Sequence, residues 1–454
     1  MSTARTLTSA WLTSLVAKVE PHERKALAIA FACNFALMGS YYILRPVRDA
    51  MATVFGADRL QDLFTGTLIF TLICSPAFAW LTDNFKLSRV LPGVFWFLIL
   101  NLLAFCGWFE VSPDSRWLAA SFYWWFSVIN LFMVSVFWSL MVDVFTPTQA
   151  GRLLPAISAS GSIGAIAGPL VASLFVKNVG VVGLLLLAAA GLVIVIALMQ
   201  WLIREKRRLQ ALHQETQASS MDRQLSGNLF DGFRTLFTSR YVMNQAIFMV
   251  LMTWIATIGY YLQTDLVARA FSDVASRTQA LADIDLAVNV CSALVAAFGL
   301  SRFISRFGVT GSLILNPILM AVSFVLMALS PTLLMLQAMQ VVRRVTQYAI
   351  ARPSREICFT VVEQESRYKA KNIIDVVVYR TGDFTAIWVQ AGMRMLGAGM
   401  GGILGLGLAA SGLWAASAWT LGRQYERRKL EMEREMPATG PAQLSDSASR
   451  SRSA

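Results

Sequence analysis

Long apolar stretches separated by short polar segments make up most of the chain. A helix that crosses a bilayer needs about 20 mainly apolar residues. Twelve stretches meet this length, and such runs predict transmembrane helices. They lie at residues 26–44, 63–81, 91–110, 117–142, 155–176, 181–203, 241–262, 281–300, 312–330, 333–351, 373–396 and 401–421. We therefore expect an all-α polytopic membrane protein with 12 transmembrane helices.

The longest polar interruption, residues 204–240, divides these spans into two sets of six. We expect an N-terminal six-helix bundle over 26–203, a cytoplasmic linker over 204–240 and a C-terminal six-helix bundle over 241–421. Phe230, Phe233 and Phe237 recur at helical spacing and predict a surface helix at the end of the linker. Residues 1–25 predict a second surface helix, and residues 422–454 form a polar tail.

The positive residues indicate how the chain is oriented. Most of the 39 Lys and Arg residues lie before residue 26, in 204–240, in the predicted loop 352–372 and after residue 421. These segments share one side of the twelve-span topology, and cytoplasmic loops are rich in Lys and Arg. We expect both termini in the cytoplasm and the protein in the plasma membrane, the inner membrane of a bacterium. The net charge of +12 then reflects topology, and no nucleic-acid partner is expected.

Several kinds of chemistry lack a signal in the sequence. The five cysteines are scattered without paired spacing, and both histidines, His22 and His213, lie in polar segments. Neither a disulfide framework nor a histidine-based metal or acid–base site is predicted. No Gly-x4-Gly-Lys-Ser/Thr run is present, so ATP-driven pumping is not supported. We expect no cofactor, no metal and no enzymatic activity.

Charged residues inside the last spans are the main candidates for function. Arg343, Arg344 and Arg380 lie at membrane depth, where together they oppose insertion by roughly 8–10 kcal/mol. Gln340 and Arg344 share one helical face, as do Arg380 and Asp383, which predicts two polar stripes facing a cavity. Arg380 and Asp383 are expected to pair within one turn. A structural ion network between helices is the competing interpretation.

A second polar group lies at the end of the first span. Tyr42, Arg45, Arg48 and Asp49 gather there, and the planar guanidinium suits phosphate or carboxylate. The alternative is an anchor of Tyr and Arg at the lipid headgroups.

The loop after the second span, with Asp83 and Arg89, resembles the loop signature between spans two and three of the major facilitator superfamily. This resemblance implies two parallel six-span repeats around a central axis, with Asp83 as part of a conformational lock. Ordinary positive-inside charge is the alternative reading of its basic residues. In the fifth span, Gly164 to Pro169 resembles the signature of antiporters in that superfamily, although helix packing explains these glycines equally well.

Two further stretches resemble the nucleotide transporter family, the ATP:ADP exchange carriers of plastids and intracellular bacteria. The first runs from Tyr41 to Asp49. The second comprises Arg352 to Glu356, Lys369 to Lys371, Asp375 to Val377, and Arg380. The resemblance implies nucleotide exchange on a major-facilitator-like fold, with Arg48 and Lys371 as basic substrate-site residues and Asp375 following in register. The chain departs from that family in its fourth span, 117–142, which contains no Asp or Glu.

The expected function is secondary transport of a small anionic, nucleotide-like or otherwise phosphorylated metabolite by alternating access and exchange. Proton-coupled drug or metabolite antiport and a non-transporting membrane scaffold are the alternatives. The residues expected to bind the substrate are Tyr42, Arg45, Arg48, Arg344, Lys371, Arg380 and Asp383. Those expected to have structural or gating roles are Asp49, Asp83, Arg89, Arg355, Glu356 and Asp375.

Overall fold

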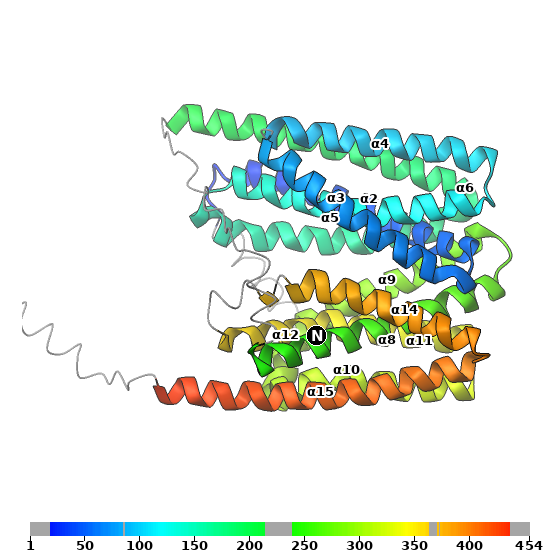
Figure 1. Cartoon of the computed structure of the whole chain (residues 1–454). Coiled ribbons are helices and arrows are strands. Elements are labelled where there is room, and N and C mark those ends of the chain that lie inside the picture. The colour runs from blue at the N-terminus through cyan, green and yellow to red at the C-terminus, as the bar shows by residue number, and fades with distance from the viewer. Residues whose placement is uncertain (1–18, 85–86, 214–237, 363–369, 372, 436–454) are drawn as a thin grey trace, which may run out of the picture.

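Two bundles of helices lie side by side in the structure, a computed structural model that describes residues 19–84, 87–213, 238–362, 370–371 and 373–435 (Figure 1). The N-terminal bundle consists of α2 (Arg24–Phe55), η1 (Ala57–Arg59), α3 (Leu60–Asn84), α4 (Leu87–Val111), α5 (Arg116–Val144) and α6 (Pro147–His213). The C-terminal bundle consists of α8 (Arg240–Ala270), α9 (Val274–Phe298), α10 (Leu300–Leu329), α11 (Leu333–Thr346), η2 (Gln347–Ala351), α12 (Arg352–Cys358), η3 (Phe359–Val361), η4 (Ile374–Val378), α14 (Tyr379–Met395) and α15 (Met400–Glu435).

Within the described residues, these elements make up 12 spans. Helix α6 contains two of them, which meet at Gly180, where φ is 70°; Gly populates this left-handed region readily. Eight helices, α6 included, are long and apolar enough to cross a membrane. The spans formed by α3, by α11 to α12 and by η4 to α14 complete the set. The predicted fold class is confirmed.

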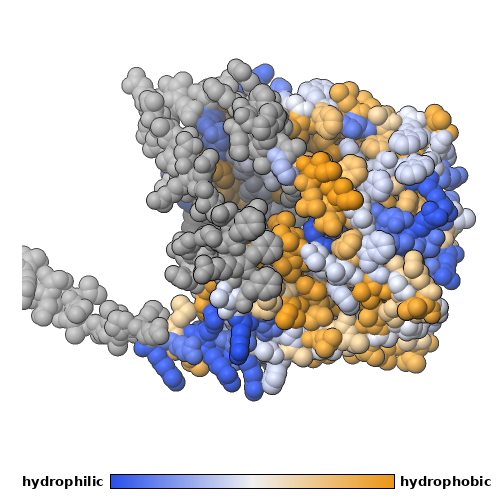
Figure 2. Space-filling view, in the orientation of Figure 1, coloured by the Kyte–Doolittle hydropathy of each residue, from blue (hydrophilic) through white to orange (hydrophobic). Residues whose placement is uncertain are grey.

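The helix ends define two sides of the molecule. On the linker side, at the left of Figure 1, α2 begins, α6 ends at His213 and α15 ends at Glu435. On the face shown in Figure 2, apolar side chains fill the middle, and hydrophilic ones gather at the right edge and around the end of α15. This distribution matches a belt that faces lipid between two ends that face water.

Small residues bring α2 and α6 close together in the N-terminal bundle. A Cβ added to Gly164 would lie 2.6 Å from the Phe35 carbonyl oxygen, and one added to Gly168 would lie 2.6 Å from that of Gly39. Without water to drive association, membrane helices gain most from such close backbone packing. The packing interpretation of these glycines therefore has a direct structural basis.

The structure corrects some boundaries. The predicted charged loop 352–372 begins as a helix, because the chain continues without a break through η2 into α12. Pro353 lies in the first turn of α12, directly after the π-helical segment η2. Helix α15 continues to Glu435, so the first part of the predicted polar tail is helical. The two predicted surface helices lie largely or wholly outside the described residues.

Candidate functional site

The charged stripes of the tenth and eleventh spans each adjoin a π-helical segment. Segment η2 begins three residues after Arg344, and η4 ends two residues before Arg380. The wider π turn breaks the regular hydrogen-bond ladder and occurs often at functional sites. Arg344 and Asp383 each lie near the middle of their spans. The sequence thus places its charges at the midplane, next to two deformable turns.

Asp285, near the middle of α9, contacts two of the midplane arginines. Its Oδ1 accepts a hydrogen bond from Arg344 Nη1 of α11, and its Oδ2 lies 3.5 Å from Arg45 Nε of α2. Asp285 and Arg344 are almost fully buried. Because Arg45 belongs to the N-terminal bundle, this carboxylate links the two bundles at the midplane. Removing one partner of a buried pair leaves an uncompensated charge.

Arg343, beside Arg344, is held by neutral groups. Its Nε donates to Gln340 Oε1 at 3.0 Å and its Nη1 donates to Gln347 Oε1 at 3.0 Å. Gln340 in turn donates to Gln263 Oε1 at 2.6 Å, which also accepts from Arg344 Nη2 at 3.2 Å. Among the described residues, no carboxylate oxygen lies within 4.0 Å of the Arg343 guanidinium. Its positive charge therefore has no direct counter-ion.

A second polar group, centred on Arg48 and Asp49, lies nearer the side of the molecule opposite the linker. It also joins the two bundles. Arg48 donates twice to Asp49 Oδ1, at 2.9 and 2.6 Å, and Tyr260 of α8 donates to the same oxygen at 3.1 Å. The Arg48 guanidinium lies over the rings of Tyr123 and Phe126, at 5.4 and 5.7 Å from their centroids. Cation–π contacts of this kind stabilise a guanidinium away from water. Arg48 therefore contacts groups inside the protein, which disfavours the alternative of an anchor at the lipid headgroups.

Asp383 does not form the predicted pair with Arg380. Its Oδ1 accepts a hydrogen bond from Thr257 Oγ1 of α8 at 3.1 Å, and no ion pair joins it to Arg380 within 4.0 Å. The reason is packing: α14 lies against α8, where a Cβ added to Gly382 would meet Thr253 Oγ1 at 2.1 Å. Asp383 is therefore directed to a hydroxyl of the neighbouring helix.

The remaining predicted residues lie at the linker side. Arg355 Nη2 is 2.7 Å from Asp375 Oδ1, and Lys371 donates to Glu356 Oε2 at 2.5 Å. These pairs join the end of the tenth span to the start of the eleventh, away from the midplane cluster. Asp83 lies in α3 and Arg89 in α4, and their side chains are outside the described part of the structure.

Hydrogen bonds also connect the bundles between the midplane and the opposite side. Arg394 of α14 donates to the Ala57 carbonyl at 3.0 Å and to Gln61 Oε1 at 3.2 Å. Trp388 donates to Thr65 Oγ1 at 3.1 Å. On the other flank, Arg277 of α9 donates to Thr53 Oγ1 at 3.2 Å.

A cavity of about 400 Å³ lies between the bundles on the linker side of the midplane. Its lining includes Asn34 and Tyr42 of α2, Trp138 of α5, Ser292 of α9 and Tyr348 of η2. Tyr42 connects the cavity with the charged cluster, because the Arg45 guanidinium lies 5.5 Å from the centroid of its ring. A pocket of this size with a few polar groups suits a small solute.

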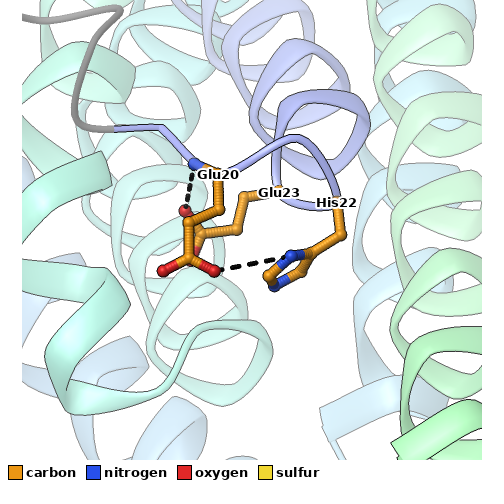
Figure 3. Close-up of side chains that lie close together, drawn as sticks. All are labelled: Glu20, His22 and Glu23. Atoms are coloured by element: carbon orange, nitrogen blue, oxygen red, sulfur yellow. Dashed lines mark hydrogen bonds and ion pairs between the residues drawn. The ribbon is translucent and has the colours of Figure 1, made fainter.

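Glu20, His22 and Glu23 gather at the start of α2 (Figure 3). Their ligand atoms lie within 4.8 Å of one another, a spacing that a metal ion could use. However, Arg152 of α6 lies 2.8 Å from Glu23 and 3.6 Å from Glu20. The Glu20 N–H donates to Glu23 Oε2 at 3.2 Å. The group therefore fits an ion network that fastens the start of α2 to α6.

Sequence reasoning missed Asp285 and Tyr260 as site residues, and it named Arg343 as a charge at membrane depth without listing it among the substrate-binding residues. An acidic residue inside an apolar span was the available signal for Asp285. Tyr260 gave no signal, because only the packing of α8 against α2 places it beside Asp49.

Two six-helix bundles around a buried polar midplane are the architecture of a class of secondary transporters. The chain belongs to the Major Facilitator Superfamily, whose family profile matches residues 30–349. A comparison with curated protein sequences gives no match. Membership of this superfamily indicates a transporter rather than an enzyme.

Those structures share the fold at low sequence identity. A bacterial homologue of the iron transporter ferroportin, in an inward-facing state, gives a TM-score of 0.62 at 12% identity, covering 89% of this chain and 100% of that chain. A bacterial homologue of the human lysosomal transporter Spinster, inward-facing and unoccupied, gives 0.56 at 13% identity, covering 90% and 99%. The nucleoside transporter NupG gives 0.51 at 14% identity, covering 88% and 98%.

Proposed function

We propose that this protein is a secondary carrier of a small anionic metabolite, working by alternating access and by exchange of one anion for another. The observation that carries the proposal is the charge at the midplane. Four carboxylates lie at or close to this depth, those of Asp49, Asp283, Asp285 and Asp383, against five guanidiniums, those of Arg45, Arg48, Arg343, Arg344 and Arg380. A surplus of buried positive charge is unfavourable without an anion.

Arg343 and Arg380 are the proposed anion-binding residues. Among the described residues, neither has a carboxylate oxygen within 4.0 Å. Arg343 keeps hydrogen-bonding capacity beyond its two glutamine partners, because a guanidinium carries five N–H donors. Arg45, Arg48 and Arg344 already have carboxylate partners and would hold the anion by exchanging those partners during the cycle.

The position of the cavity supports alternating access. It lies on the linker side, while the contacts of Arg394, Trp388 and Arg277 join the bundles on the opposite side. With the linker in the cytoplasm, as the positive residues indicate, this is an inward-facing arrangement. The ferroportin and Spinster homologues are also described as inward-facing.

We further propose that the transported anion is nucleotide-like. This proposal is supported by the resemblance of the stretches around Arg48 and Asp375 to nucleotide transporters. Lys371, which the same resemblance assigns to the substrate site, pairs with Glu356 at the linker-side end of the eleventh span. We therefore propose that Lys371 acts at the mouth of the path rather than at the midplane site. Cationic drug transport is disfavoured by the same surplus of arginines.

Counterflow into proteoliposomes tests the proposal, using labelled ADP, glucose 6-phosphate and succinate as probes. At least one probe should exchange in the wild type. Arg343→Gln should lower that exchange by about ten- to a hundredfold, because a hydrogen bond to a charged group contributes about 1.5–3 kcal/mol. Arg343 suits the test, since its loss leaves no carboxylate unpaired.

Arg306→Gln is the matched control, because Arg306 is exposed on α10. A wild type that exchanges none of the three anions contradicts the proposal. So does an Arg343→Gln variant that exchanges as fast as the Arg306→Gln variant.

A further inference from the structure

Ser292, on α9, has a hydroxyl without a partner in the part of the chain that the structure describes. Its Oγ is buried and makes no hydrogen bond there. Serines elsewhere in the spans, such as Ser40 and Ser411, donate to the carbonyl four residues earlier in their own helix. Buried hydroxyls are nearly always hydrogen-bonded. Because Ser292 lines the cavity on the linker side of the midplane, that cavity is the place where a ligand would supply its partner.

Asn289 lies one turn closer to the midplane, on the same face of α9. Its Nδ2 donates to the Ala165 carbonyl of α6 at 2.7 Å. A carbonyl only accepts hydrogen bonds, so this contact fixes which end of the amide faces α6. The other end, Oδ1, accepts no hydrogen bond from a described residue, and Asn289 lines the same cavity. The cavity therefore has an amide acceptor at Asn289 and a hydroxyl at Ser292.

These two side chains continue a stripe that begins at Asp285, since residues 285, 289 and 292 follow one another at i, i+4 and i+7. With a rise of 1.5 Å per residue, Asn289 lies about 6 Å and Ser292 about 10 Å from Asp285 along the helix axis, towards the linker side. Asp285 itself contacts Arg45. An anion held by the midplane arginines therefore has its uncharged part within reach of Asn289 and Ser292 when it extends towards the linker.

Aromatic rings and small residues shape this cavity. Tyr42 of α2, Trp138 of α5 and Tyr348 of η2 form part of its wall. The lining residues of α6 are all small: Ser158, Gly161, Ser162 and Ala165. Aromatic side chains pack well against the ring of a ligand, and small side chains leave room for it. Tyr42 also adjoins the charged cluster, because the Arg45 guanidinium lies 5.5 Å from its ring centroid.

We propose that this cavity binds a ring of the transported anion, and that Asn289 and Ser292 select rings that carry O–H or N–H donors. This rests on the proposed anion transport. The substrate is then an organic phosphate or carboxylate with a hydroxylated or amino-bearing ring, as in a sugar phosphate or a nucleotide. A plain dicarboxylate fits less well, because its second carboxylate only accepts hydrogen bonds and would face the Asn289 Oδ1.

Calorimetric titration of the purified protein in lipid nanodiscs tests this with two pairs of anions. ADP is matched with pyrophosphate and glucose 6-phosphate with inorganic phosphate, so that each pair differs by the ring. At least one ring-bearing anion should bind more tightly than its match. Ser292→Ala and Asn289→Ala should each weaken that anion by about three- to tenfold, the effect of one hydrogen bond, and leave the ring-free anion unchanged.

Ser292→Ala is the cleaner variant, because its hydroxyl has no partner among the described residues to lose. Asn101→Ala is the matched control for Asn289→Ala. The Asn101 amide donates to the Phe97 carbonyl of its own helix, α4, and the residue is not part of the cavity lining. Binding of both pairs should be the same in this control as in the wild type.

Two uncharged probes, adenosine and glucose, separate the possible failures. If both variants change the ring-bearing and ring-free anions equally, or change neither, the ring site is overturned and the anion carrier remains. If no anion binds but adenosine or glucose does, with lower affinity in Ser292→Ala, the anion carrier is overturned and the ring site remains. A wild type that binds none of the probes overturns both.

Discussion

Asp285 shows how much one residue controls in this site. It contacts Arg344 within its own bundle and Arg45 of the other bundle. An ion pair inside the membrane contributes little net stability, because desolvation offsets the attraction between the charges. What the pair provides is position: it fixes two guanidiniums at the midplane, on the two walls of the proposed path.

We predict that Asp285→Asn destabilises the protein by about 3–5 kcal/mol, because it leaves Arg344 buried without a carboxylate. The double variant Asp285→Asn with Arg344→Gln should recover part of that loss, since two amides can bond to each other. Unfolding of the detergent-purified protein measures both, with Asp58→Asn as the exposed control. A single variant as stable as the control would contradict the prediction.

At the scale of the element, glycines and caps decide how helices meet and where they begin. Gly168 allows α6 to approach the backbone of α2, and Gly382 allows α14 to approach α8. Asp273 is the N-cap of α9, because its side chain accepts a hydrogen bond from the Ser276 N–H at 2.7 Å. These local features orient the spans that carry Tyr42, Asp285 and Asp383.

Gly168→Ala should lower the unfolding free energy by about 1–3 kcal/mol, since the added methyl must displace backbone or Tyr42. The Cβ would lie 2.6 Å from the Gly39 oxygen and 2.7 Å from the Tyr42 Cβ. Gly107→Ala on α4 is the matched control, because nothing lies within 4 Å of its Cβ. Thermal unfolding in detergent measures the difference, and equal midpoints would show that the helices separate without cost.

The stability of the first turn of α9 should depend on pH through its N-cap residue, Asp273. The hydrogen bond from the Ser276 N–H holds the pKa of this exposed carboxyl below its usual range. Its contribution to stability is therefore present above the unfolded-state pKa, which is about 3.9, and is lost as the pH falls through the lower folded value. Hydrogen exchange at the Ser276 amide should accelerate in Asp273→Ala at neutral pH, where the cap contributes about 1 kcal/mol. Unchanged exchange would contradict this role.

At the scale of the whole molecule, the contacts between the bundles are unevenly distributed. Those of Arg394, Trp388 and Arg277 close the side opposite the linker, and the cavity lies on the linker side. Alternating access requires the first set to break while contacts form on the other side. Each of these hydrogen bonds is weak enough to exchange for water.

Arg394→Ala combined with Trp388→Phe should therefore shift the population towards opening on the opposite side. Spin labels at Asp58 and Leu396, both exposed near the Arg394 contact, would report this as a longer distance in double electron–electron resonance. Arg423→Ala, which removes an arginine stacked on Trp419 of its own helix, should leave the distances unchanged. An unchanged distribution in the double variant would show that other contacts hold this side closed.

The sequence by itself determined the spans and the two-bundle fold, because hydropathy and length are properties of contiguous residues. It also placed Arg344, Arg380 and Asp383 on polar stripes at membrane depth. Only the tertiary structure decided the partners: Asp285 with Arg45 and Arg344, and Asp383 with Thr257 rather than Arg380. Helical spacing relates residues within one span, whereas these pairs join residues far apart in the chain and depend on how the helices pack.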